Sequence, residues 1–148
     1  MPDTGANWGA WAAVAKSGGG DWTNLDVADN GNAGSGAISL DGIAALEIGF
    51  DLYEDNTGAV DGDVTVYIMG DVDGTNYQGA PSGAYDATVI ASAFPVKVRP
   101  VQNKHFYDRF VLSGLEYSSI RLWILNEAGQ TLTTTFKYRT ATIPLATA

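Results

Sequence analysis

Short runs in which apolar and polar residues alternate recur along this 148-residue chain, and this period of two constrains the fold more than any other feature. The clearest run is LEIGFDLY at residues 46–53. Successive side chains of a β-strand point to opposite faces, so this run separates its large apolar residues from its polar residues and Gly49. We predict a half-buried strand whose inward residues are Leu46, Ile48, Phe50 and Leu52.

Five further runs have the same character and are rich in the valine, threonine and aromatic residues that strands favour. In SIRLWIL, the aliphatic residues Ile120, Leu122 and Ile124 are expected to point inward, opposite Arg121 and Trp123. The prolines of FPVKVRP indicate an edge strand, because proline cannot donate to a sheet ladder. The predicted strands are VTVYIM (64–69), FPVKVRP (94–100), HFYDRFVL (105–112), SIRLWIL (119–125) and TLTTTFKYR (131–139).

The N-terminal segment ANWGAWAAVAK, residues 6–16, is ambiguous because its tryptophans and alanines recur at helical intervals. Gly9 interrupts the segment, however, and the rest of the chain reads as β. We therefore predict a strand here, with Trp8 and Trp11 on opposite faces.

Turn signals rich in glycine, aspartate and asparagine separate the strands at short intervals. Many short strands with this spacing are typical of an all-β protein. We predict an antiparallel β-sandwich of jelly-roll or Greek-key type. It should form a single domain over residues 1–148, with termini that can extend as arms.

Length and composition place the chain among cytoplasmically synthesised proteins. A chain of this size can bury roughly 68–70% of its extended surface in one core, so it needs no covalent staple, and it contains no cysteine. The N-terminal residues do not contain a basic segment followed by an apolar run, so we expect no signal peptide. No apolar run approaches the roughly 18 residues of a membrane span, so we expect no membrane contact.

Charge is distributed unevenly. Residues 1–86 contain 14 acids and one base, whereas residues 87–148 contain three acids and seven bases, which together give the net charge of −9. This balance argues against a nucleic-acid partner, which would require a basic patch. The acidity indicates either a solvated surface or self-complementarity between copies of the chain.

The stretch GDVDGTNYQ, residues 70–78, resembles part of a calcium loop. If Gly74 took the place of the EF-hand glycine, the first ligand position would fall on Met69 and the closing glutamate on Ala80, so the pattern fails at both ends. Asp-Gly after a strand is instead a strong hairpin signal. We predict a turn, and the alternative is a weak calcium site. In that alternative, Asp71 and Asp73 bind calcium with oxygens from residues 54–56 or from Asp61 and Asp63.

No catalytic or cofactor-binding constellation is evident. His105 is the only histidine, and we interpret it as a strand residue that pairs across a sheet. Ser35 lies between glycines but lacks the strand-to-helix elbow of a hydrolase nucleophile. The many carboxylates occur mostly in turns, where aspartate bends the backbone. We therefore expect no enzyme, no catalytic residue, no cofactor and no metal site.

Aromatic residues give a second hypothesis. The four tryptophans, with seven tyrosines, could form a flat platform on which sugar rings pack, as in β-sandwich carbohydrate-binding modules. The simpler interpretation is that these side chains fill the core. The residues concerned are Trp8, Trp11, Trp22 and Trp123.

The chain also resembles small virion proteins of tailed bacteriophages over most of its length. The likeness lies in NWGAWAAVA, AGSGAISLDG, ALEIGFDLYEDNTGAVDGDVTVYIMGDVDGTNYQGAP, IRLWILNEAGQTL and FKYRTAT. These are strand and turn signatures. The chain departs from that pattern at Glu127 and Ala128 and in its longer segment VKVRPVQNKHFYDRF, a candidate for an adapted interface.

The resemblance implies a capsid decoration (cement) protein of the virion that bridges capsomers and stabilises the head. Its partners would be the major capsid protein or another virion protein, and a homo-oligomer, with a trimer favoured, would be expected. The alternative is a carbohydrate-binding or receptor-binding β-sandwich module, for example in a phage tail.

The decoration hypothesis predicts a trimer or larger species in solution, measurable by light scattering behind gel filtration. The mass should be the same in calcium and in chelator. A monomer in both buffers would favour carbohydrate binding, and a mass that collapses on chelation would show that Asp71 and Asp73 hold a metal.

Overall fold

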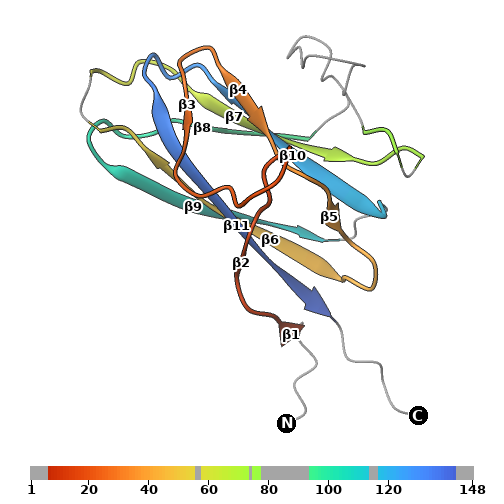
Figure 1. The fold of residues 1–148 in the computed structure, drawn as a ribbon. Helices are drawn as coiled ribbons and strands as arrows, with labels where there is room; N and C mark the ends of the chain where they lie inside the picture. Colours follow the sequence, from red (N-terminus) through yellow and green to blue (C-terminus); the bar gives the residue numbers. More distant parts are fainter. Residues whose placement is uncertain (1–6, 56–57, 74, 78–93, 114–116, 143–148) are drawn as a thin grey trace, which may run out of the picture.

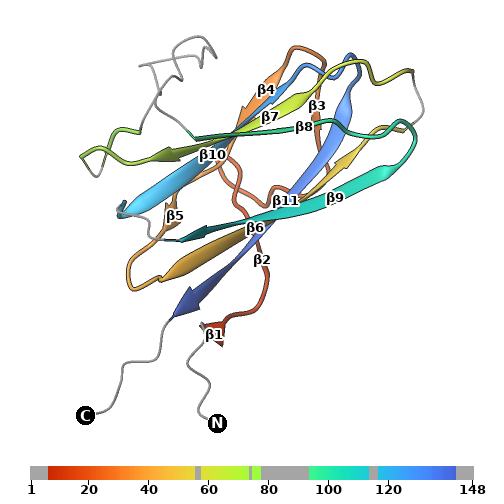
Figure 2. The same cartoon turned by 180° about the vertical axis from the view of Figure 1, so that it is seen from behind.

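The computed structural model describes residues 7–55, 58–73, 75–77, 94–113 and 117–142. These residues form two antiparallel β-sheets packed face to face, which confirms the predicted β-sandwich (Figures 1 and 2). None of them belongs to a helix that could span a bilayer. The termini, predicted to act as arms, lie outside the described residues.

The first sheet is organised around its longest strand, β11. One side of β11 pairs with β6, which in turn pairs with β9, and the other side pairs in succession with β3, β2 and β1. The six strands are β1 (Asn7–Trp8), β2 (Ala12–Ala13), β3 (Leu25–Val27), β6 (Ala45–Tyr53), β9 (His105–Ser113) and β11 (Leu132–Thr142).

The second sheet has the order β4-β10-β7-β8, with β5 also paired to β10. Among the described strands β8 is the last in this order, which agrees with the edge position predicted from its prolines. The five strands are β4 (Asn32–Gly34), β5 (Ile38–Ser39), β7 (Val64–Gly70), β8 (Phe94–Val98) and β10 (Ser119–Asn126).

The core lies between the two sheets and follows the predicted alternation. Every second residue of β6, β7 and β10 points into it, as the sequence pattern required. Strand β7 is covered on both faces, as predicted for VTVYIM. The inward residues of these three strands are Leu46, Ile48, Phe50, Leu52, Val64, Val66, Ile68, Ile120, Leu122 and Ile124.

The N-terminal segment is extended, so the choice of strand over helix is confirmed, although the strand is broken. Two residues of β1 and two of β2 pair with β11, and the chain leaves the ladder between them. After β2 the chain reverses in a loop whose three consecutive glycines, 18–20, all have positive φ. Glycine adopts this conformation without a steric cost.

A buried hydrogen bond anchors the loop that follows. The Trp22 side chain is fully buried and packs against Phe136, with ring centroids 4.7 Å apart. Its Nε1 donates to Thr134 Oγ1 at 2.8 Å, and that hydroxyl donates to the carbonyl of Leu25 at 2.8 Å. One threonine on β11 therefore satisfies two buried polar groups of the N-terminal segment.

We expect Thr134→Val to lower the free energy of unfolding by about 1–3 kcal/mol, because it leaves the buried Trp22 N–H without its partner and removes one hydrogen bond to the part-buried Leu25 carbonyl. Urea denaturation would measure the loss. The control is Thr133→Val, which makes the same change on the solvent face of the same strand and should stay within about 0.5 kcal/mol of the parent. Equal losses in the two variants would contradict this role of Thr134.

Candidate functional site: a groove on the outer face of the first sheet

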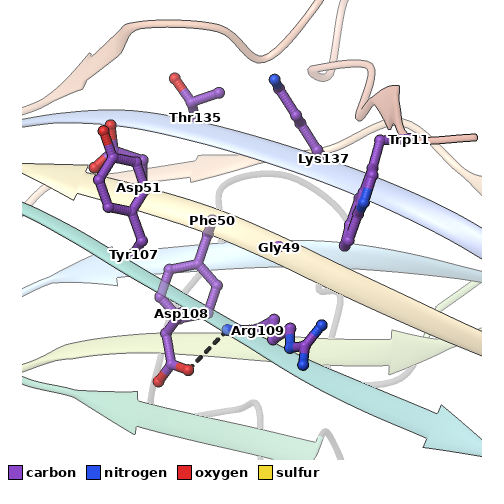
Figure 3. Close-up of a pocket in the computed structure, with 9 residues that line it drawn as sticks. All are labelled: Trp11, Gly49, Phe50, Asp51, Tyr107, Asp108, Arg109, Thr135 and Lys137. Atoms are coloured by element: carbon purple, nitrogen blue, oxygen red, sulfur yellow. Dashed lines mark hydrogen bonds between the residues drawn. The ribbon is translucent and has the colours of Figure 1, made fainter.

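A groove of about 680 Å³ crosses the solvent-facing side of β11, β6 and β9 (Figure 3). Strand alternation places most core residues of these strands on the opposite side, and Phe50 is the core residue that also lines the groove. It is lined by Trp11, Gly49, Phe50, Asp51, Tyr107, Asp108, Arg109, Thr135 and Lys137.

The register of the three strands creates the hollow. Lys137, Gly49 and Arg109 lie opposite one another and form one cross-strand row. Because Gly49 has no side chain, the middle of this row has room for the edge of the Trp11 indole, with a cationic residue on each side. The next row on the same face consists of Thr135, Asp51 and Tyr107.

The indole of Trp11 forms one wall of the groove and is 43% exposed. A Cβ added at Gly49 would lie 3.2 Å from this ring, so the absence of a side chain there lets the indole sit close to the sheet. The guanidinium of Arg139 lies 4.8 Å from the centre of the Trp8 ring and 4.9 Å from that of Trp11. The prediction that Trp8 and Trp11 lie on opposite faces is wrong, because strand alternation does not continue across the break between β1 and β2.

A buried carboxylate holds two arginines beneath this wall. The Glu47 side chain is only 2% exposed. Its Oε2 accepts a hydrogen bond from Arg139 Nε at 2.6 Å, and its Oε1 accepts one from Arg109 Nη1 at 3.0 Å. Glu47 therefore fixes both the cation that contacts the tryptophans and a cation that lines the groove.

Stacked rings form the opposite wall. Tyr107 is 72% exposed, and its ring is nearly parallel to that of His105, with centroids 5.5 Å apart. His105 stacks in turn on Tyr53 at 4.0 Å, so the prediction that this histidine pairs across the sheet is confirmed. His105 Nδ1 also lies 2.7 Å from Asp51 Oδ2. The second oxygen, Asp51 Oδ1, is buried and has no hydrogen-bond partner among the described residues.

The other two tryptophans do not reach this face. Trp22 belongs to the core, as the simpler interpretation predicted. Trp123 lies on the second sheet, where its ring covers Gly34 and packs beside Met69 and Tyr77. The exposed aromatic surface of the groove is therefore made by Trp11 and Tyr107, with the buried Phe50 behind them. The sequence analysis had not singled out Tyr107, Arg109 or Lys137.

The stretch GDVDGTNYQ forms a turn where the structure describes it. Asp71 and Tyr77 face each other in an antiparallel bridge, and the Val72 amide donates to the Asn76 carbonyl at 2.7 Å. Gly74, on which the prediction relied, lies outside the described residues.

Both carboxylates of this turn bind groups of the protein itself. Asp73 Oδ1 accepts the backbone amides of Asn76 at 2.7 Å and Thr75 at 3.0 Å. These hydrogen bonds, that of Asn76 foremost, hold the pKa of Asp73 below its ordinary value. Asp71 accepts hydrogen bonds from the amide and the hydroxyl of Ser118.

Two of the additional acids considered for a calcium site, Asp63 and Glu54, have other partners, and residue 56 lies outside the described residues. Asp63 precedes β7 and Asp71 follows it, so the strand separates them by about 26 Å. Asp63 pairs with Arg99 at 2.9 Å, and the buried Glu54 accepts two backbone amides. Within the described ranges, no group of three or more acidic, histidine or cysteine residues is placed to hold a metal ion.

The residues with potential catalytic chemistry do not come together in one site. Ser35 is buried, and its Oγ donates to the Gly36 carbonyl and accepts the Leu122 amide. The register puts Asp51 and Asp108 on opposite faces of the first sheet, and Figure 3 shows their side chains on different sides of the ribbon.

No protein-family model matches the chain, and no curated protein matches it. One similar solved structure is the CBM22-1 xylan-binding domain of Xyn10C from Paenibacillus barcinonensis. The two sequences are 14% identical, and the alignment covers 90% of this chain and 86% of that chain with a TM-score of 0.42. A structure described as "CBM4 structure and function" has 12% identity, 95% and 80% coverage, and a TM-score of 0.37. Both scores are low, so what this chain binds has to be inferred from its own groove.

We expect the Asp73 carboxyl to titrate below the ordinary range of an aspartate. Because the folded pKa is lowered, the turn hydrogen bonds should be fully present above the unfolded pKa and be lost as the pH falls through the folded one. Carboxyl ¹³C shifts, followed with the amide shifts of Thr75 and Asn76, would measure this. In Asp73→Ala those amide titrations should disappear. An ordinary midpoint, or one that moves on adding calcium, would contradict this assignment.

Proposed function

We propose that this protein is a non-catalytic carbohydrate-binding β-sandwich module, with the groove as its glycan site. The observation that carries the proposal is the pair of exposed aromatic side chains, Trp11 and Tyr107, on either side of the hollow at Gly49. Exposed aromatic rings are costly to leave in water, so two of them around one groove indicate a ligand that covers them.

The composition of the groove suits a sugar. The C–H face of a pyranose packs against an indole or phenol ring, while its hydroxyls need hydrogen-bond partners at the rim. Asp51 and Thr135 offer oxygens here, and Lys137 and Arg109 offer N–H donors. A binding site of this kind combines apolar walls with a few polar groups that fix orientation.

The rigidity of the walls supports the same proposal. Trp11 rests on Arg139, which the buried Glu47 holds, and Tyr107 stacks on His105, which Asp51 holds. Side chains that are ordered before binding lose less conformational entropy when the ligand arrives. Both aromatic walls are therefore already in position.

The proposal assigns the groove a binding role and no reaction. Glycoside hydrolysis needs two carboxyl groups that flank one bond at a defined separation. The two acidic residues of this groove, Asp51 and Asp108, extend from opposite faces of the sheet. Decoration of a capsid stays a prediction from the sequence, and the solution mass tests it.

We expect Trp11→Ala to weaken glycan binding by about 2 kcal/mol, roughly 30-fold, because it removes the larger aromatic wall. Affinity electrophoresis against a panel of soluble polysaccharides would identify the ligand, and calorimetry would measure the loss. Tyr107→Ala should also weaken binding. Val72→Ala, at a residue that is 70% exposed in the distant turn, is the control and should bind like the parent. A Trp11→Ala variant that retains full affinity would refute the proposed site.

A further inference from the structure

We infer that the glycan of this groove is acidic, with a uronate carboxylate held between Lys137 and Arg109. This inference rests on the proposed carbohydrate-binding function and names the substrate class for the same site. It is based on the row of residues that forms the floor of the groove and on the balance of charge around it.

The floor places one cationic residue on each side of Gly49. Neighbouring strands lie about 4.8 Å apart, so the backbones of Lys137 and Arg109 are separated by about 10 Å, with Gly49 between them. Figure 3 shows the two side chains on either side of Gly49. Both side chains are long enough to converge on one carboxylate placed beside the indole edge that covers the glycine, since charge-assisted hydrogen bonds span about 2.7–2.9 Å.

The cations outnumber the carboxylates around Glu47. Glu47 is a single carboxylate shared by Arg109 and Arg139, so this group of three carries a net positive charge. Lys137 is exposed and makes no ion pair with any residue that the structure describes. These four residues together carry a charge of about +2, which the carboxylates of Asp51 and Asp108 in the same groove offset.

The cationic groups can reach a ligand. The Arg109 side chain is 67% exposed and uses Nη1 for Glu47, which leaves further N–H donors directed at solvent. One oxygen of each acidic residue of the groove already has a partner in the protein, whereas Asp51 Oδ1 has none among the described residues. Asp51 Oδ2 lies 2.7 Å from His105 Nδ1, and Asp108 Oδ1 accepts the backbone amide of Arg109 at 2.8 Å.

The indole distinguishes an acidic sugar from a simple anion. Trp11 lies against Gly49, at the point where the two cations flank the floor. An inorganic anion would gain little from an apolar ring, whereas a uronic acid residue presents a C–H face to the ring and a carboxylate to the cations. A uronic acid residue would therefore contact both the Trp11 ring and the two cations.

The test is calorimetry with tetragalacturonate and with its fully methyl-esterified form, at about 0.15 M salt, where long-range repulsion is screened beyond about 8 Å. The two probes share one backbone and differ in charge. We expect the acid to bind at least about tenfold more tightly than the ester, despite the acidity of the chain. Equal affinities would overturn the inference.

Lys137→Met tests the site itself, because it removes the charge and keeps an unbranched side chain. It should reduce affinity for the acid about tenfold and leave affinity for the ester nearly unchanged. The control is Lys97→Met on β8 of the other sheet, which should bind both probes like the parent. A similar loss in both variants would overturn the inference, since it would indicate diffuse electrostatic attraction.

The outcomes also separate this inference from the proposed function. If neutral polysaccharides bind as tightly as the acid, and Trp11→Ala weakens that binding, the acidic preference is overturned. The carbohydrate-binding function would still stand. Binding of the acid that is unaffected by Trp11→Ala would overturn both.

Discussion

The buried carboxylate of Glu47 is the interaction on which the functional face depends. An unpaired charge in this position would be strongly unfavourable, and removing one partner of a buried ion pair typically costs about 3–5 kcal/mol. Glu47 on β6 is paired on both sides, with Arg109 on β9 and Arg139 on β11. The same contacts that satisfy this charge position the Trp11 indole, through Arg139, and one of the cations of the groove. Stability and binding geometry therefore share one set of atoms.

The features that the sequence could predict are those with a local cause. Alternation within a strand depends only on backbone geometry, so the inward faces of β6, β7 and β10 followed from their residues alone. The turn at Asp71–Tyr77 and the edge position of β8 followed from residue types that favour those conformations. His105 was correctly placed in a strand, since its neighbours alternate.

The groove could not be predicted, because it depends on register between distant segments. Gly49, Arg109 and Lys137 form one row only when β6 is aligned with both β9 and β11. The break between β1 and β2 begins at Gly9, but nothing within the segment indicates that it brings Trp8 and Trp11 onto one cation. One local signal existed: a glycine in the interior of a strand often marks the close approach of another group, here the indole of Trp11.

The pairing of β1 and β2 with β11 imposes an order on biosynthesis. The first strands of the sandwich have their hydrogen-bonding partners at residues 137–142, so they must wait until nearly the whole domain has left the ribosome. Loop-closure entropy makes such distant pairings slow to form. A nascent or truncated chain that lacks β11 would carry Trp11 without the arginine and the strand that seat it. The groove therefore forms only in a chain that has been synthesised through β11.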